Sequence, residues 1–284
     1  MTSTRTLITP EMPAGGAALG PGAMLDALWR QRRVTRKLGS RQVQMRHRGT
    51  VFGVAWTVLN PLLLLAVYTL IFTGVLQVGG SSTAERIAFA VQMFCGMVVF
   101  SVFADTISRA PLLITSRPNY VKKVVFPLEA LVTAELYASL VLGAASLLVL
   151  LVAVAVVHGG FAITALALPL VLPPLVLLTL GAAWFVAALS VYVRDVATSI
   201  GVVVTILFFL TPVFWQVGQW PEDLQTYVWL NPLAVLIESA RDCLLRDRWP
   251  DGTRLLLTYI ESFGVAWLGF AWFRHGKRGF ADVL

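Results

Sequence analysis

The stretch that decides the fold is Leu128–Val157, with the sequence LEALVTAELYASLVLGAASLLVLLVAVAVV. Its two charged residues, Glu129 and Glu135, lie near the start, so everything from Leu136 onward is uncharged. A helix rises 1.5 Å per residue, and about 20 apolar residues cross the roughly 30 Å hydrocarbon core of a bilayer. This stretch therefore predicts a transmembrane helix.

Further apolar runs lie on both sides of this stretch, and the composition of the whole chain agrees with them. Of 284 residues, 57% are hydrophobic and 13% are charged, whereas soluble domains carry about a quarter charged residues. We expect an all-α, polytopic membrane protein whose six spans form one domain over residues 49–284. The expected spans cover residues 51–76, 88–108, 128–157, 161–191, 198–214 and 255–273.

Three prolines interrupt the fourth expected span. Pro169, Pro173 and Pro174 each lack the N–H that would continue the hydrogen-bond ladder of a helix. Inside a membrane, such residues are tolerated where neighbouring groups satisfy the freed carbonyls. We expect a kink in this span.

The basic residues divide unequally between the two sides that six spans create. The connections on the side of the N-terminus carry 17 of the 22 lysines and arginines, and the other side carries five. Because cytoplasmic connections are enriched in Lys and Arg, both termini are expected on the cytoplasmic side of a bacterial inner membrane. Orientation and anionic lipid explain the net charge of +7, so we expect no nucleic-acid partner.

Two segments precede the first span. Residues 1–22 are rich in Pro, Gly and Ala and lack the apolar core and cleavage site of a signal peptide, so a disordered cytoplasmic tail is expected. Residues 23–48 are basic, but Met24, Leu28 and Leu38 belong to an apolar series at mostly three-to-four-residue spacing. That spacing predicts an amphipathic helix in the membrane interface. A solvated basic helix is the alternative.

The long segment between the fifth and sixth spans, residues 215–254, is too broken for a further span. Pro221 followed by two acids resembles the first turn of one short helix. Asn231 and Pro232 supply the cap and first-turn proline of another, expected over residues 233–245. We expect short helices that form a lid on the outer side.

No residue pattern points to catalysis in this chain. The three histidines are scattered over different connections, and Cys95 and Cys243 match neither a metal-ligand spacing nor a disulfide framework. The only Gly-Lys pair, at Gly276, lacks the other residues of a phosphate-binding loop. A transport subunit without a metal or cofactor of its own is expected, and any ATP is hydrolysed by a partner.

Several polar and aromatic residues within the spans have two readings. The acids Asp105, Glu129, Glu135 and Glu261 are either structural or part of an ion-coupled transport path. Phe89, Gln92, Gly96, Phe100 and Phe103 fall on one helical face, and aromatic faces stack on sugars, although lipid-facing packing explains them equally. Gly49 and Gly53 have the four-residue spacing that permits close helix packing.

Six strings in this order resemble the transmembrane subunit of ABC exporters for polysaccharides and teichoic acids, the Wzm-type permeases. They cover about residues 30–284. The strings are RQVQMRHRGT at 41–50 running into GVAW at 53–56 and LNP at 59–61, SR at 108–109 with NYVKKVVFP at 119–127, YVRDV at 192–196, FFLTPV at 208–213, LNP at 230–232, and FADV at 280–283. Gln42 stands where an acidic residue is usual in the family, which leaves the role of that position in placing the ATPase open.

The resemblance implies a homodimer with two separate cytoplasmic ATPase subunits that bind ATP and magnesium. It implies a coupling helix in the loop between the second and third spans. The implied ATPase contacts are Ser116, Arg117, Asn119, Tyr120, Val121, Lys122 and Lys123. A simple basic loop is the alternative.

The resemblance also implies a path for a lipid-linked polysaccharide through the dimer. Arg41, Arg46, His47 and Arg48 would meet its headgroup, since guanidinium groups bind pyrophosphate bidentately, although anionic membrane lipids explain the same charges. The implied channel aromatics are Trp56, Tyr68, Phe72, Phe89, Phe100 and Phe103. The implied periplasmic gate comprises Trp215, Trp220, Trp229, Asn231 and Pro232.

Four functions therefore remain open on the sequence. Export of a lipid-linked glycan leads, with an actinobacterial cell-wall galactan favoured by the composition, and O antigen or teichoic acid after it. An ABC drug or lipid exporter would use the same spans without a sugar channel. An ion-coupled transporter would depend on Asp105 or Glu135, and a membrane glycosyltransferase lacks the acid cluster that it would need.

Overall fold

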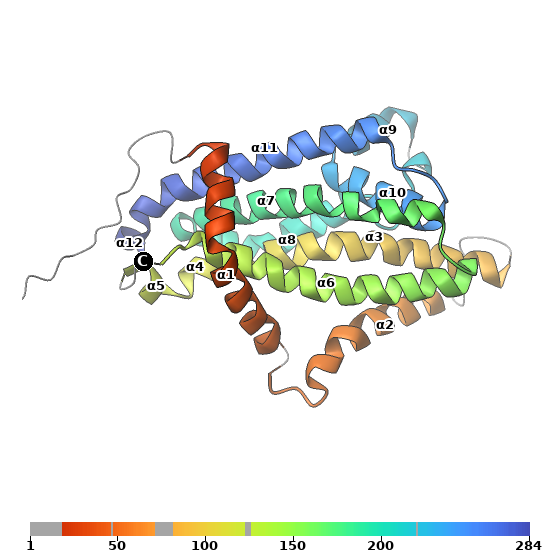
Figure 1. Cartoon of the computed structure of the whole chain (residues 1–284), viewed down its shortest axis with the longest axis horizontal. Coiled ribbons are helices and arrows are strands. Elements are labelled where there is room, and N and C mark those ends of the chain that lie inside the picture. The colour runs from red at the N-terminus through yellow and green to blue at the C-terminus, as the bar shows by residue number, and fades with distance from the viewer. Residues whose placement is uncertain (1–18, 47, 72–81, 123–125, 220) are drawn as a thin grey trace, which may run out of the picture.

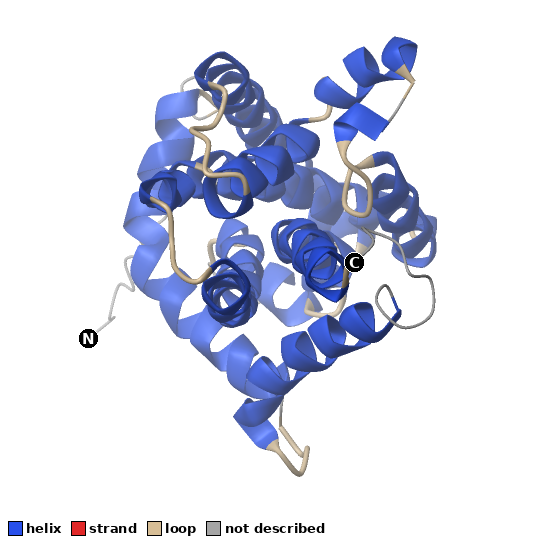
Figure 2. Cartoon of the chain, turned by 90° about the vertical axis from the view of Figure 1, so that its right-hand side faces the viewer, coloured by secondary structure: helices blue, strands red, loops and turns tan. Residues whose placement is uncertain are grey.

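The computed structural model describes residues 19–46, 48–71, 82–122, 126–219 and 221–284. Within these ranges every regular element is a helix, and turns and loops join the helices (Figure 2). The all-α fold class is confirmed. The expected disordered tail falls mostly on residues 1–18, outside the described residues.

Four segments of the described chain are long and apolar enough to cross a membrane. They are α3 (Thr83–Arg109), α6 (Glu129–His158), the run from the 3-10 helix η4 (Ile163–Leu170) through α7 (Leu172–Tyr192), and α11 (Gly252–Gly276). The expected second, third, fourth and sixth spans coincide with them. The expected first and fifth spans form shorter apolar helices, α2 (Trp56–Thr69, 14 residues) and α8 (Asp195–Leu210, 16 residues).

The long helices lie side by side, and short elements gather at the two ends of the bundle (Figure 1). One end carries α9 (Glu222–Trp229) and α10 (Pro232–Leu245). The other end carries α4 (Leu112–Thr115), α5 (Pro118–Lys122), α12 (Phe280–Val283) and the C-terminus, and we call it the α5 end. The loop between the second and third expected spans and the segment between the fifth and sixth therefore lie at opposite ends of the bundle.

The closest helix pair in the bundle is α7 with α11, and two glycines make it possible. A Cβ atom at Gly269 would lie 2.8 Å from the Cα atom of Gly181, and one at Gly181 would lie 2.6 Å from the Cα atom of Ala266. Real Cβ atoms do not approach backbone so closely. Small residues that let two backbones approach are the usual basis of helix packing in membranes, where lipid removes most of the hydrophobic drive.

The prolines break the fourth expected span where the sequence predicts it. The 3-10 helix η4 ends at Leu170, and α7 begins two residues later with Pro173 in its first turn. The carbonyl of Leu170 accepts a hydrogen bond from the Tyr259 hydroxyl of α11 at 2.8 Å. A neighbouring helix therefore satisfies a carbonyl next to the break, as a low-dielectric surrounding requires.

The N-terminal helix α1 (Pro21–Arg46) crosses the long helices near the α5 end (Figure 1). It begins two residues before the expected start. Met24 is buried against the bundle, whereas Trp29 on the other side is 68% exposed. A Cβ atom at Gly39 would lie 3.0 Å from the carbonyl oxygen of Ala134 in α6, so the two helices touch closely there. One apolar side packs on the protein and the other faces outward, as the expected interface helix requires.

The expectation that Gly49 and Gly53 pack two helices together is wrong. Both have positive φ angles, 83° and 50°; Gly49 lies in a turn, and Gly53 begins the short 3-10 helix η2 (Gly53–Ala55) that leads into α2. A Cβ atom at either position would have no neighbour within 4 Å. These glycines serve the left-handed backbone conformation of a turn, which four-residue spacing alone does not distinguish from a packing motif.

The two short helices expected between the fifth and sixth spans are present, but the second lies deeper than a lid. Asn231 caps α10 by accepting a hydrogen bond from the Leu233 N–H at 3.0 Å. Most of α10 is buried, and it packs against α3, η4 and α11. α9 has only Val228 buried among its described side chains. The apolar residues of α10 therefore belong to the bundle itself.

Candidate functional site

A cluster of charged side chains joins α1 to α3 and α6. The Arg46 guanidinium donates to the Asp105 carboxylate and to the Glu135 carboxylate, each at 2.5 Å. Ser139 donates to Asp105 at 2.6 Å, and Arg109 bonds it at 3.1 Å. The side chains of Arg46 and Glu135 are only 9% and 6% exposed. Two arginines thus balance two acids in a poorly hydrated place.

The other intramembrane acids also have simple surroundings. Glu129, the first residue of α6, pairs with Arg274 at 3.3 Å and with Lys277 at 3.1 Å. Glu261 of α11 is exposed. The partners of Asp105, Glu129 and Glu135 favour structural roles over a path for a coupling ion.

Replacing Arg46 with alanine is expected to lower the free energy of unfolding by about 3 kcal/mol, because the buried Glu135 would lose its close partner and keep only the half-exposed Arg109 at 3.7 Å. α1 should then be cut faster by a protease added in detergent, and the thermal midpoint should fall. Arg41→Ala is the matched control, since Arg41 is on the same helix and exposed. Equal midpoints for the Arg46→Ala and Arg41→Ala proteins would contradict this.

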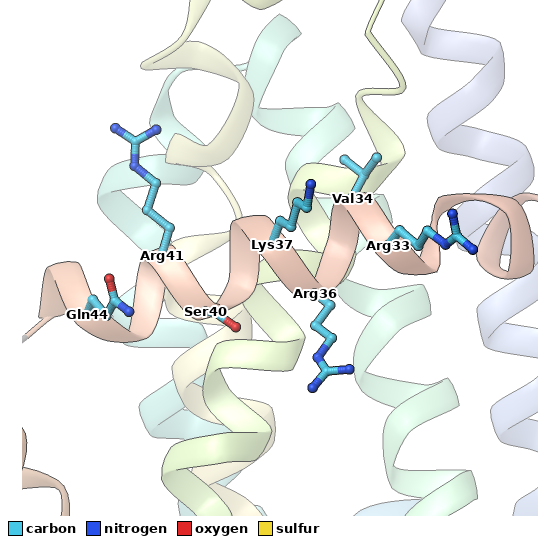
Figure 3. A pocket seen from close by; sticks show the side chains of 7 residues that line it. All are labelled: Arg33, Val34, Arg36, Lys37, Ser40, Arg41 and Gln44. Atoms are coloured by element: carbon cyan, nitrogen blue, oxygen red, sulfur yellow. The ribbon is translucent and has the colours of Figure 1, made fainter.

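The face of α1 that points away from this cluster is basic. Seven residues line an open groove of about 600 Å³ along it, and four of them are cationic with no acid among them. Figure 3 shows the side chains of Arg36 and Arg41 projecting away from the helix. The lining residues are Arg33, Val34, Arg36, Lys37, Ser40, Arg41 and Gln44.

The four residues that the sequence assigned to a lipid headgroup are therefore not equivalent. Arg41 lines the basic groove and Arg48 is exposed near the end of α1. Arg46 points to the opposite side, into the cluster with Asp105. His47 lies outside the described residues. The groove adds Arg33, Arg36 and Lys37, which the sequence analysis did not single out.

The predicted ATPase contact forms a compact helical turn at the α5 end. Ser116 lies between α4 and α5 and its hydroxyl donates to the Leu112 carbonyl at 2.5 Å. Ser116 and Asn119 are exposed and Arg117 is half-buried. α5 ends at Lys122, and Lys123 lies outside the described residues. The exposed Asn119 of α5 faces outward, away from the bundle.

The remaining two predicted contact residues form the inner side of α5. Tyr120 and Val121 are half-buried and pack against the hydrophobic core. The Tyr120 ring contacts Phe126, with ring centroids 5.0 Å apart. The core therefore determines where this short helix lies.

The aromatic residues predicted to line a channel on α3 are mostly inside the bundle. Phe100 and Phe103 are 4% and 6% exposed. Phe100 packs edge-on against Phe208 of α8, with ring centroids 5.2 Å apart. Phe89 is half-buried. This face of α3 packs against neighbouring elements of the same chain.

The predicted aromatics of α2 lie nearer the surface. Trp56 is half-buried and packs edge-on against Phe52 at 5.6 Å. Tyr68 is half-buried and its ring lies 6.2 Å from that of Phe214. Phe72 lies outside the described residues. Trp56 and Tyr68 are therefore more accessible than the buried Phe100 and Phe103, as the half-buried Phe89 is.

A fully buried arginine organises the other end of the bundle. Arg241 of α10 has no exposed surface. Its guanidinium donates to the carbonyls of Pro212 at 2.8 Å, Val213 at 2.5 Å and Trp215 at 3.1 Å. It also pairs with the Glu238 carboxylate at 2.7 Å. One side chain thus holds the backbone that follows α8 against α10.

The same arginine links this backbone to α3. Its Nε donates to the Gln92 carbonyl at 3.3 Å. A Cβ atom at Gly96 would lie 2.8 Å from the Arg241 Nη2 and 2.9 Å from the Val213 carbonyl oxygen. A glycine is therefore needed at position 96, and it serves this arginine instead of an open sugar-stacking face.

The predicted gate residues that the structure describes lie in the Arg241-held segment, at the end of α9 and at the start of α10. Trp215 is 54% exposed, and Trp229 stacks under the Arg254 guanidinium at 3.8 Å. The Asn231 amide, which also caps α10, donates to the Thr211 hydroxyl at 2.9 Å. Pro232 begins α10, and Trp220 lies outside the described residues.

No group of three or more His, Cys, Asp and Glu side chains that could hold a metal ion occurs in the part of the chain that the structure describes. Cys95 and Cys243 are both buried and free.

Comparison with known proteins places these features in a family. The profile of the ABC-2 type transporter family matches residues 33–245. The O-antigen export system permease protein RfbA of Myxococcus xanthus is 27% identical over 264 residues, which cover 92% of this chain and 99% of that protein. RfbA of Klebsiella pneumoniae is 22% identical over 86% of this chain and 92% of its own. The polysialic acid transport protein KpsM of Escherichia coli is 22% identical over 82% and 90%.

The matched region runs from the middle of α1 through the end of α10, so it includes the basic groove, α5, the Arg46 cluster and the Arg241 network. It covers well over half of the chain. The chain belongs to the ABC-2 type transporter family.

Proposed function

We propose that this chain is the membrane-spanning permease of an ATP-driven exporter of a lipid-linked polysaccharide. The observation that carries the proposal is the similarity over nearly full length to permeases named for O-antigen export. The sequence lacks a phosphate-binding loop, which agrees with ATP and magnesium being bound by a separate subunit. The exported glycan is O antigen, teichoic acid or a cell-wall galactan.

In this proposal the chain crosses the bacterial inner membrane six times, with both termini in the cytoplasm. The excess of basic residues on one side supports that orientation. α2 and α8 are the first and fifth crossings, and at 14 and 16 residues they need a thinned bilayer or a neighbour. Both expose apolar side chains, such as Leu63 and Phe209, which lipid or the second copy of a homodimer would cover.

The working parts follow from the two ends of the bundle. α5, with the exposed Asn119, and the half-buried Arg117 just before it form the contact of each of two ATPase subunits. The basic groove of α1, with Arg41, receives a pyrophosphate headgroup from the inner leaflet. Trp56, Tyr68 and Phe89, which are half-buried, are the accessible channel aromatics, and residues 215–232 form the outer gate.

Reversing the charge at Arg117, by Arg117→Glu, tests the ATPase contact in the assembled transporter. We expect the co-purified ATPase subunit and the exported glycan both to fall by about tenfold, since a contact side chain would now repel its site. Arg194→Glu is the matched control, because Arg194 is exposed in the turn between α7 and α8 and lies outside the proposed contact. Equal binding of the ATPase subunit by the two variants would show that α5 is not part of the ATPase contact.

The class of transporter is tested in cells that lack this chain. Export of a lipid-linked glycan predicts that such cells retain the undecaprenyl-linked glycan inside and regain export when the chain is restored. An ABC drug or lipid exporter predicts no retained glycan. An ion-coupled transporter predicts export that persists when ATP is depleted and the ion gradient is held, which would overturn the proposal.

A further inference from the structure

The last residues of the chain fold back onto the proposed ATPase contact. After α11, the 3-10 turn η6 (Lys277–Gly279) leads into α12, and α12 contacts α5. Figure 1 shows both short helices at the α5 end, next to the C-terminus. The FADV string at residues 280–283 is thus placed beside α5, although the fold of the bundle does not require it there.

A single aromatic side chain anchors this return. Phe280 has no exposed surface. Its ring lies 5.9 Å from that of Tyr192 at the end of α7 and 5.6 Å from that of Phe273 in α11. Phe280 therefore ties α12 to the ends of two long helices.

The turn before Phe280 is fitted closely to the same tyrosine. The Tyr192 hydroxyl donates to the Gly276 carbonyl at 2.6 Å. A Cβ atom at Gly279 would lie 2.7 Å from that hydroxyl oxygen. The glycine and the tyrosine thus fix where the chain leaves α11.

An ion pair adds a third attachment. Lys277 of the turn binds the carboxylate of Glu129 at 3.1 Å. Glu129 begins α6 and its side chain is 4% exposed. The turn is therefore held to α6, the helix that follows α5 in the chain, as well as to α7 and α11.

α5 needs such support because it is too short to hold its own position. It has five residues, and isolated helices shorter than about 12–15 residues are not stable in water. Its position depends on what packs against it, which is the core through Tyr120 and Val121, and α12.

We propose that residues 277–284 form a coupling brace, which holds α5 to the ends of α7 and α11 so that a displacement of α5 moves these helices with it. Phe280 is the positioning residue of the brace. The proposal rests on the proposed function for the source of the displacement, the ATPase subunit. The brace gives α5 a connection to the bundle in addition to α4, to the core contacts of Tyr120 and Val121, and to the chain that leads into α6.

The test uses Phe280→Ala in the full transporter with its ATPase subunit. We expect amide hydrogen exchange over α4 and α5 to rise by about tenfold or more, while exchange over the middle of α6 stays unchanged. In proteoliposomes, ATP hydrolysis should stay within about twofold of the unaltered complex while export per ATP falls by about tenfold. The reason is that the ATPase subunit still binds α5, but the displacement of α5 no longer moves α7 and α11. Phe161→Ala, at a Phe that is 56% exposed, is the matched control and should change neither quantity.

Two outcomes would overturn the brace. One is unchanged exchange over α5 in the Phe280→Ala protein, and the other is an equal rise over α6, which would make Phe280 an ordinary core residue. If that variant does not assemble, Tyr192→Phe removes only the bond to the Gly276 carbonyl and is judged by the same ratio of exchange rates. If the unaltered complex exports no glycan, the proposed function fails, while the exchange measurement still decides whether residues 277–284 hold α5.

Discussion

Replacing Arg241 with methionine is expected to lower the thermal midpoint of the detergent-solubilised protein by on the order of 10 °C. The variant loses the donor for four backbone carbonyls, and it leaves Glu238 with Arg246 as its remaining ion-pair partner. Removing one member of a buried ion pair costs about 3–5 kcal/mol. In a site without exposed surface, water does not replace the lost bonds.

The loss should also be local in its effect on function. Three of the four carbonyls that Arg241 binds belong to the segment from Pro212 to Trp215, which follows α8. Freed from α10, this segment should become accessible to a protease added from outside, and export should fall together with the thermal midpoint. Arg241→Lys should be intermediate, because an ammonium group has three donors and cannot span the same carbonyls in a fixed plane.

Arg248→Met is the matched control for this experiment. Arg248 is exposed, three residues beyond the end of α10. Its replacement should leave the thermal midpoint within about 1–2 °C, as surface substitutions usually do. If the Arg241→Met and Arg248→Met proteins had the same thermal midpoint, Arg241 would not hold the segment from Pro212 to Trp215.

Gly269→Ala is expected to separate α7 from α11, the closest pair in the bundle. Its methyl group would meet the backbone of Gly181, which cannot rotate away as a side chain can. Overpacking of a well-filled contact costs about 1–3 kcal/mol, and a clash between backbones belongs at the upper end. We expect a lower thermal midpoint and a larger aggregated fraction in size-exclusion chromatography.

The control for this variant lies on the same helix. A Cβ atom at Gly264 would have no neighbour within 4 Å. Because alanine favours a helix by about 1 kcal/mol over glycine, Gly264→Ala should be neutral or slightly stabilising. If Gly269→Ala behaves in the same way, the close contact between α7 and α11 does not exist in the folded protein.

The sequence was sufficient for what depends on neighbours along the chain. The uncharged run after Leu136 predicted α6, the prolines predicted the break at Val171, and Asn231 with Pro232 predicted the start of α10. Each of these signals acts through local hydropathy or backbone geometry, so the chain itself carries it. The positions of α2 and α8 were predicted too. α8 is about as long as the expected fifth span, whereas α2 is shorter than the expected first span.

The sequence was insufficient where a side chain meets a distant partner. Glu238 and Arg241 lie three residues apart on α10, and both are buried although they are charged. Their partners come from the backbone after α8, and carbonyls leave no trace in a sequence. The sequence analysis assigned Arg46 to a lipid headgroup. Its actual pairing with Asp105 and Glu135 depends on how α1 crosses the bundle, which the sequence does not show.

The prediction of a sugar-stacking aromatic face on α3 was wrong for a related reason. Helical spacing correctly placed Gly96 and Phe100 on one side of α3, but it gave no information on what that side meets. Phe100 meets Phe208, and Gly96 meets Arg241. The one signal that could have been found is the glycine, since a glycine within an apolar helix often marks a close approach.

The contact between Gly181 and Gly269 also sets an order for the making of the protein. The glycine of α11 follows its partner in α7 by roughly 80–90 residues, which a ribosome adds in about 4–18 s. During that interval α7 is already made while its partner is still being translated. The last helix to be synthesised therefore completes the bundle, and a nascent chain truncated before α11 presents the glycine face of α7 to whatever insertase or chaperone attends it.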